Sequence, residues 1–224
     1  MQDERALRDQ ARQAVREAGG DPARPDLERL QRHARRTLDG QLARIRHAHA
    51  PMACARGCAL CCHLRVMATP AEVFALARYM RRELGPRGLD EAGQRIAGTA
   101  ARLRALPPGS LLATNVPCPL LVDDACSMYP ARPFNCRAYH SLDYAACLES
   151  FNDPGNATLT HPQSALVARI NEGVQQGLHD AVRASGLDTR QYELVTALDE
   201  ALSDPDAEAR FLRGEPAFRT ALRP

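Results

Sequence analysis

Long stretches of the chain repeat apolar residues every three or four positions, the spacing of one face of an α-helix. This pattern predicts helices over residues 3–18, 25–47, 70–84 and 89–106. The third begins at Thr69-Pro70-Ala71-Glu72, a capping box with proline at the first helical position. The spacing returns after residue 160 and predicts two further helices, which begin at the capping box Thr160-His161-Pro162-Gln163 and at Asp188-Thr189-Arg190-Gln191.

Residues 111–140 lack this spacing and contain four prolines. Two short apolar pieces flank Asp123-Asp124, a pair typical of a tight turn, and predict a small hairpin with Cys118 before its first arm and Cys126 in its second. We therefore expect a mainly α fold, with helices around a small, irregular, cysteine-rich metal-binding centre that includes a short β-hairpin. The predicted parts are an N-terminal helical extension (1–50), a cysteine-cluster domain (51–160) and a C-terminal helical segment packed on it (161–224).

Composition supports helices over sheets and bounds the compartment. Aromatic residues make up 4% of the chain and tryptophan is absent, so the core must be built from aliphatic side chains. The first residues are charged, without the apolar run of a secretory signal, and no stretch approaches the roughly 18 apolar residues of a membrane span. We expect a cytoplasmic protein with no membrane partner, in which thiols stay reduced and serve as ligands rather than disulfides.

The candidate chemistry lies in eight cysteines that fall in two segments. Thiolates select zinc, copper(I) or iron–sulfur clusters over hard cations, so this pattern predicts a metal centre. Three close thiols in the first loop and a distant fourth favour an iron–sulfur cluster, whereas structural zinc more often uses paired C-x2-C knuckles; zinc stays open as the alternative. The predicted metal ligands are Cys54, Cys58, Cys61, Cys62, Cys118, Cys126, Cys136 and Cys147.

Some of these assignments have a plain structural alternative. Side chains of neighbouring residues diverge, so Cys61 and Cys62 would not easily bind one tetrahedral ion; either one is a spectator or more than one metal is bound. Cys62 and Cys147 could equally be buried apolar thiols. His63 and His140 could bind metal, donate to a bound sulfur, or be ordinary core or surface histidines. Arg132 and Arg137 could neutralise an anionic site or be turn residues, and we expect Asp143 to be a cap.

These motifs together resemble a known family. The sequence CARGCALCC, followed by CPLL and CSMYPARPFNCR, is similar to the YkgJ-type cysteine-cluster family over roughly residues 54–147. That family is described as a zinc- or iron-chelating domain, and its members are often labelled iron–sulfur-cluster proteins. The resemblance implies metal binding at seven matching cysteines, with Cys147 more loosely placed, but it implies no settled reaction.

Several functions remain compatible with a thiolate metal centre. The chain could carry a structural metal, or pass electrons or metal to a protein partner. It could be a metal-dependent enzyme, either redox or methylase-like, because the resemblance extends to flagellin lysine methylases. A radical SAM fold is disfavoured because the chain has almost no strand pattern. A zinc module for nucleic acid is also disfavoured, since residues 51–160 hold 11 arginines against 9 acidic residues and few aromatics.

Overall fold

The protein is described by a computed structural model that covers residues 4–23, 25–46, 52–55, 57–107 and 109–224. The helical spacing near the N-terminus is confirmed by α1 (Glu4–Glu17) and α2 (Leu27–Arg46), while the predicted end at His47 lies outside the described residues. The capping box at Thr69 is also confirmed, and opens α3 (Pro70–Glu83). The next helix, α4 (Gly85–Arg104), begins four residues earlier than expected because Pro86 sits in its first turn, where proline needs no amide partner.

The remaining described elements are short apart from one long helix, α7. They are η1 (Leu60–His63), β1 (Met67–Ala68), η2 (Ser110–Leu112), β2 (Leu121–Val122), β3 (Ala125–Cys126), η3 (Tyr129–Ala131), α5 (Phe134–Ala138), α6 (Tyr144–Asn152), α7 (Ala165–Ala184), β4 (Tyr192–Glu193), α8 (Leu194–Ser203) and α9 (Ala207–Leu212). The expected mainly α class with a short hairpin is therefore confirmed. No helix among the described residues is long and apolar enough to cross a membrane.

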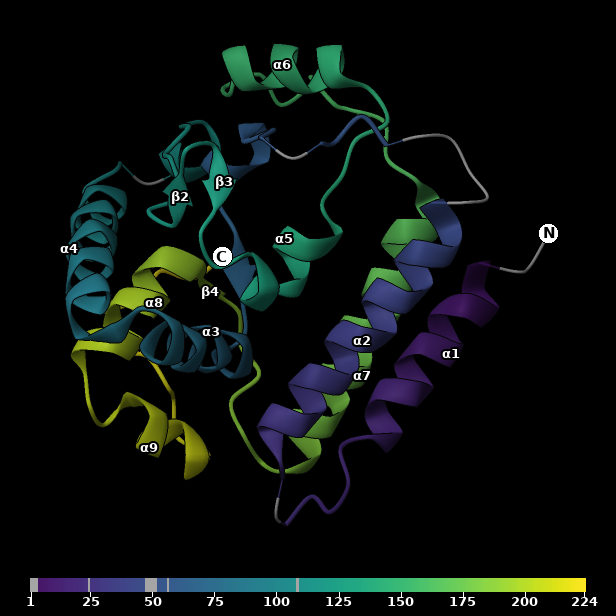
Figure 1. The fold of residues 1–224 in the computed structure, drawn as a ribbon, viewed down its shortest axis with the longest axis vertical. Coiled ribbons are helices and arrows are strands. Elements are labelled where there is room, and N and C mark those ends of the chain that lie inside the picture. Colours follow the sequence, from purple (N-terminus) through teal and green to yellow (C-terminus); the bar gives the residue numbers. More distant parts are fainter. Residues whose placement is uncertain (1–3, 24, 47–51, 56, 108) are drawn as a thin grey trace.

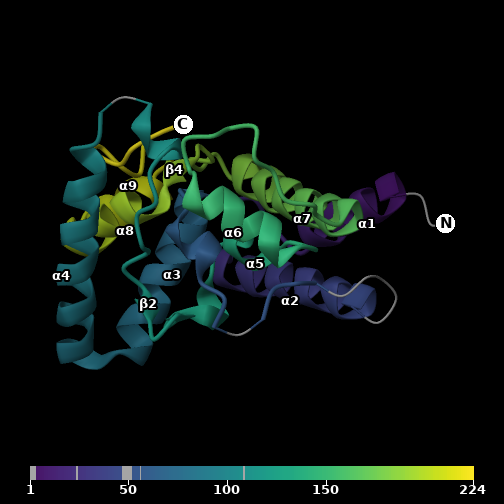
Figure 2. The same ribbon diagram turned by 90° about the horizontal axis from the view of Figure 1, so that it is seen from above.

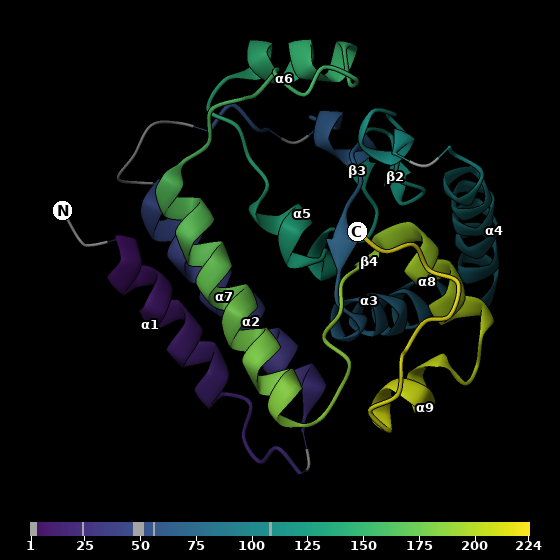
Figure 3. The ribbon, with the colours of Figure 1, turned by 180° about the vertical axis from the view of Figure 1, so that it is seen from behind.

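Three helices from the two ends of the chain lie side by side as one layer. Figures 1 and 3 show α1 and α2 against α7, although more than 100 residues separate α2 from α7. The contact between α1 and α7 is close because α7 carries glycines where they meet. A Cβ atom added at Gly173 would lie 2.2 Å from the carbonyl oxygen of Arg8, and one at Gly177 would lie 2.4 Å from that of Arg12. Only glycine fits this backbone approach.

A second group of helices, α3, α4, α8 and α9, lies on the other side of the molecule, with α4 at the opposite edge from α1 (Figure 2). A two-stranded antiparallel pair joins its distant segments, because β1 pairs with β4 in the register Met67 to Glu193 and Ala68 to Tyr192. The short helix α5 lies between the two groups, and α6 lies at the edge of the molecule (Figure 1). The cysteine segments approach each other around these two helices.

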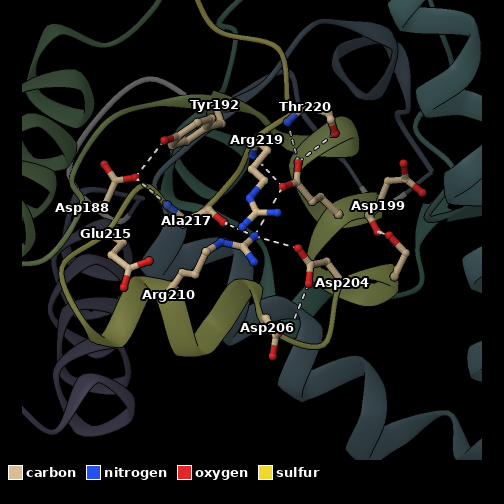
Figure 4. Close-up of polar contacts among 12 residues, drawn as sticks. Asp188, Tyr192, Asp199, Asp204, Asp206, Arg210, Glu215, Ala217, Arg219 and Thr220 are labelled. Atoms are coloured by element: carbon tan, nitrogen blue, oxygen red, sulfur yellow. Dashed lines mark hydrogen bonds and ion pairs between the residues drawn. The ribbon is translucent and has the colours of Figure 1, made fainter.

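Buried carboxylates fix the C-terminal tail against α8 and α9 (Figure 4). Glu200 accepts the main-chain amides of Arg219 at 2.6 Å and Thr220 at 2.8 Å. Asp188 accepts the hydroxyl of Tyr192 at 2.8 Å and the amide of Ala217 at 3.2 Å. Each carboxylate thus satisfies donors that a tail without regular structure would otherwise leave unpaired.

Two predicted helix starts are wrong. The second capping box was expected at Thr160, but α7 begins at Ala165 with Ser164 as its cap. The chain before it is held extended because the amide of Leu142 donates to the carbonyl of Pro162 at 2.9 Å. The helix expected from Asp188 begins instead at Leu194, since Tyr192 and Glu193 are taken up by strand β4.

The hairpin is where the sequence predicts it. Strands β2 and β3 pair antiparallel, with Leu121 opposite Cys126 and Val122 opposite Ala125. Asp123 and Asp124 form the turn, with φ angles of 49° and 56°. Two successive residues in the left-handed region are characteristic of the tight turns whose twist matches that of a hairpin. This turn brings Cys126 back toward the segment that contains Cys118.

Candidate metal centre

Main-chain hydrogen bonds hold the first cysteine loop against the second cysteine segment at both ends. At one end the amide of Cys118 donates to the carbonyl of Cys62 at 2.8 Å. At the other, the amide of Ala53 donates to the carbonyl of Ser141 at 2.9 Å, and the Ser141 amide donates to the Sγ atom of Cys54 at 3.3 Å. Gly57, with a φ of +89°, allows the loop to turn between these ends. The fold therefore brings the two thiol-rich segments together.

Three thiols lie beside the hydrophobic core and a fourth, Cys62, acts on them electrostatically; we call Cys62, Cys118, Cys126 and Cys136 the inner set. Cys118, Cys126 and Cys136 each pack against core side chains. Burial raises the pKa of Cys118 to about 12 and also raises that of Cys136. The charges of Cys118, Cys126 and Cys62 raise the pKa of Cys136 further, which places all four thiols in one neighbourhood. Close, buried thiols of this kind repel one another as thiolates unless a cation joins them.

Three other thiols act electrostatically on Tyr139, and we call Cys54, Cys61 and Cys147 the outer set. Burial raises the pKa of Tyr139 to about 12, and the charges of Cys61, Cys147 and Cys54 add to that effect. Cys54 is exposed, and Cys147 lies on α6, a helix with no buried residue. The outer set is thus held by the loop and α6, at the edge of the molecule rather than on its core.

The adjacent cysteines connect the two sets. A hydrogen bond between the two side chains lowers the pKa of Cys62 to about 7 and raises that of Cys61. This hydrogen bond favours the thiolate form of Cys62 over that of Cys61. Cys62 belongs with the inner thiols, while Cys61 also interacts with Cys54 in the outer set and with Cys136.

Arg132 supplies a positive charge to the inner set. Its guanidinium lies 3.5 Å from the centroid of the Tyr129 ring, and its Nε atom donates to the carbonyl of Tyr129 at 3.2 Å. The charge of Arg132 helps to lower the pKa of Cys62 and opposes the upward shifts at Cys126 and Cys136. The predicted neutralising role of this arginine agrees with its position.

The other residues singled out from the sequence have mainly structural contacts. His140 is buried; its Nδ1 atom donates to the carbonyl of Ala138 at 2.8 Å, and its Nε2 atom accepts the amide of Ser164 at 2.8 Å. With both nitrogens in use, it is a core histidine. His63 contacts the carbonyl of Ala59 through Nδ1 at 3.1 Å and packs edge-on against Phe151.

Asp143 is the cap of α6, as expected, and accepts the amide of Ala145 at 2.8 Å. The Nη1 atom of Arg137 donates to both carboxylate oxygens of Asp39 of α2, at 2.8 and 2.9 Å. Cys58 is half-buried. Arg137 therefore holds α5 against α2 instead of facing the thiols.

Sequence reasoning missed the two tyrosines of the centre and a supporting carboxylate. Tyr129 and Tyr139 lie within or beside the second cysteine motif, but a lone tyrosine carries no metal signal. Glu72 was identified only as part of a capping box, yet its Oε1 atom also accepts the amide of Phe134, at 2.9 Å, where α5 begins. That helix carries Cys136, so Glu72 positions one of the inner thiols.

The donor set fits a soft metal, because every side chain in both sets offers sulfur. Within the described ranges, no three Cys, His, Asp or Glu side chains already converge on one point that could hold an ion. A bound metal would supply the positive charge that lets these thiols ionise together. The candidate donors are the inner set, with Arg132 as the nearby cation, and the outer set, which acts on Tyr139.

Comparison with known proteins finds a match over the same segment. Residues 53–157 match the family model CxxCxxCC, described as "putative zinc- or iron-chelating domain". No curated protein and no solved structure matched the chain. All eight cysteines fall inside the matched residues, as do Arg132 and Tyr139. Residues 53–157 are therefore similar to this zinc- or iron-chelating family, and the similarity spans just under half of the chain.

Proposed function

We propose that this protein binds an iron–sulfur cluster or zinc through its two thiol-rich segments, in the reducing environment of the cytoplasm. The observation that carries the proposal is the inner set, in which Cys62 from the first segment meets Cys118, Cys126 and Cys136 from the second. Four sulfur donors are the usual complement of a structural zinc ion or of a cluster.

The electrostatics of the inner set support a bound cation. Burial raises the pKa of Cys118 and Cys136, so without a metal these thiols stay protonated near neutral pH. A metal ion or cluster binds the thiolate form and releases the protons. Four thiolates around a divalent ion leave a net negative charge. The guanidinium of Arg132, held over the Tyr129 ring, offsets part of that charge.

The arrangement bears on the choice between the two metals. The sequence suggested three loop thiols and one distant thiol, whereas the inner set takes one thiol from the loop and three from the second segment. Four sulfur atoms from separate elements fit either a tetrahedral zinc ion or a cubane cluster. The donor set therefore supports a thiolate-bound metal and leaves its identity to elemental analysis.

The deciding experiment is anaerobic purification followed by elemental analysis and a visible spectrum. Iron with matching acid-labile sulfide and a brown charge-transfer band would establish a cluster, and stoichiometric zinc in colourless protein would establish a zinc site. Replacing Cys136 by serine should reduce the metal content, while replacing Ser127, which follows Cys126 in the hairpin, by alanine should not. Wild-type protein free of both metals after anaerobic preparation would contradict the proposal.

A further inference from the structure

We propose that Ser141 is a positioning residue for Cys54, and that its main-chain amide holds this cysteine in place as a metal ligand. The inference rests on the proposed metal-binding function and deepens it, because it identifies what orients an exposed thiol of the first cysteine loop. The donor is an N–H group of the second cysteine segment, 87 residues further along the chain. Groups that hydrogen-bond to a metal ligand fix its orientation and tune its affinity for the metal.

Cys54 needs such support more than the cysteines of the second segment do. It is exposed, whereas Cys118, Cys126 and Cys136 pack against the hydrophobic core. It also lies between α2 and η1, in a stretch that contains no helix or strand among the described residues. Neither burial nor regular secondary structure therefore fixes the direction of its side chain.

Ser141 holds Cys54 by a reciprocal pair of main-chain contacts. Its amide donates to the Sγ atom of Cys54 at 3.3 Å, and its carbonyl accepts the amide of the preceding residue, Ala53, at 2.9 Å. One contact fixes the main chain beside Cys54, and the other fixes its sulfur atom. Together they set where this thiol lies relative to the second cysteine segment.

Ser141 is itself fixed by contacts on both sides. It is 1% exposed, and its Oγ atom donates to the carbonyl of Asp143 at 2.8 Å and accepts the amide of the same residue at 3.0 Å. The residue before it, His140, is buried and accepts the amide of Ser164, the cap of α7. The segment between α5 and α6 is thus tied to the start of α7 (Figure 1). The folded protein therefore places the donor at Cys54 without help from a bound metal.

The chemistry of the contact suits a metal ligand. A sulfur atom that binds a metal keeps electron pairs that can accept a hydrogen bond, and an N–H group directed at it offsets part of its negative charge. Because the donor belongs to the main chain, every residue type except proline supplies it. Substitutions at position 141 can therefore separate the effect of the amide from that of the serine side chain.

The test is a double-mutant cycle on Zn²⁺ affinity, measured anaerobically by competition with a chromophoric chelator. Ser141→Pro removes the amide and keeps the carbonyl, and it should weaken Zn²⁺ binding by about 10–100-fold, the usual effect of losing a group that orients a metal ligand. In a Cys54→Ala background the same proline should change the affinity by no more than about twofold, because the sulfur that the amide would contact is gone. Ser141→Ala keeps the amide and is the matched control, which should weaken binding less than Ser141→Pro does.

Other results would overturn the inference in distinguishable ways. Unchanged affinity in Ser141→Pro, or an equal loss in both backgrounds, would show that the amide does not act through Cys54. Wild-type affinity in Cys54→Ala would remove Cys54 from the ligands while leaving metal binding by the inner set intact. Wild-type protein that binds no Zn²⁺ and contains no iron would contradict the proposed function itself.

A second variant keeps the test usable if circular dichroism shows that Ser141→Pro does not fold. His140→Ala leaves the Ser141 amide in the chain and removes the contact to Ser164 that supports it. It should weaken Zn²⁺ binding in the wild-type background and have little effect in the Cys54→Ala protein. Equal losses in the two backgrounds would again refute the positioning role.

Discussion

Glu72 links the capping box of α3 to the helix that carries an inner thiol, and we predict that Glu72→Gln destabilises the protein. The side chain is 4% exposed. Its Oε2 atom accepts the amide and the hydroxyl of Thr69 at 2.9 and 2.8 Å, and its Oε1 atom accepts the amide of Phe134 at 2.9 Å. Both oxygens are therefore acceptors for main-chain donors, and glutamine keeps only one acceptor oxygen.

The expected cost follows from these contacts. Whichever way the new amide turns, its NH2 group faces a buried N–H, and at least one charge-assisted hydrogen bond is lost. Such bonds contribute about 1.5–3 kcal/mol each. The glutamine also removes a negative charge that acts on Arg35. Burial and the charge of Arg137 lower the pKa of Arg35 and the charge of Glu72 raises it, so losing Glu72 makes the buried guanidinium less stable. We expect a loss of about 2–3 kcal/mol, which is a fall in Tm of about 4–12 °C for a chain of this size.

The assay is thermal unfolding by circular dichroism, with metal content measured on the same samples. Glu83→Gln, an identical change on the exposed last turn of the same helix, is the control and should stay within about 0.5 kcal/mol of wild type. Because α5 carries Cys136, the Glu72 variant should also release its metal more readily. Equal melting temperatures for the two variants would refute the assignment of Glu72 as a buried link.

Three further predictions test the fold and the site. Gly177→Ala should lower the free energy of unfolding by about 1–3 kcal/mol, because the new methyl group would lie 2.4 Å from the carbonyl oxygen of Arg12. Gly98→Ala, where a methyl group would meet no atom within 4 Å, should instead stabilise α4 by about 0.5–1 kcal/mol. Urea unfolding measures both changes. Burial alone would raise the pKa of Asp188, but hydrogen bonds from Arg190, Tyr192 and Ala217 outweigh burial and lower the pKa. The stability that Asp188 contributes is therefore present above its unfolded pKa, and it is lost as the pH falls through its folded pKa. Asp188→Asn should therefore melt lower than wild type at pH 7, and the difference should shrink below about pH 4. Removal of the metal with a chelator under reducing conditions should lower Tm, since clustered thiols lose the cation that joins them; identical melting of metal-free and metal-loaded protein would show that the metal is not structural.

Local signals predicted most of the helices correctly. The capping box at Thr69 and the apolar spacing of the N-terminal helices describe interactions within one turn or one face, which the sequence carries directly. The hairpin was predicted for the same reason, because the turn at Asp123 and Asp124 is set by those residues themselves. The pattern at Thr160 has the same local form, yet the structure places its helix start at Ser164. There, a main-chain contact with Leu142 and the acceptor on His140 override the local preference.

Contacts between distant segments account for what the sequence could not predict. Strand β4 exists because Tyr192 pairs with Ala68, more than 100 residues earlier, and nothing near Tyr192 in the sequence encodes that partner. The same holds for the thiols. Their number and their two segments were evident from the sequence. The association of Cys62 with Cys136, and the effects of Cys61 and Cys147 on Tyr139, depend on where the rest of the fold places α5 and α6.

The placement of α5 also shows why residues outside the matched cysteine segment matter to the centre. Helix α5 has five residues, too few to be stable alone, and three separate elements hold it. Glu72 of α3 accepts its first amide, Asp39 of α2 pairs with Arg137, and Gln175 of α7 donates to Asn135 at 3.0 Å. Two of these three supports lie outside residues 53–157. The flanking helices therefore take part in orienting Cys136, and a change in how they pack should be felt at the inner thiols before it is felt at the outer ones.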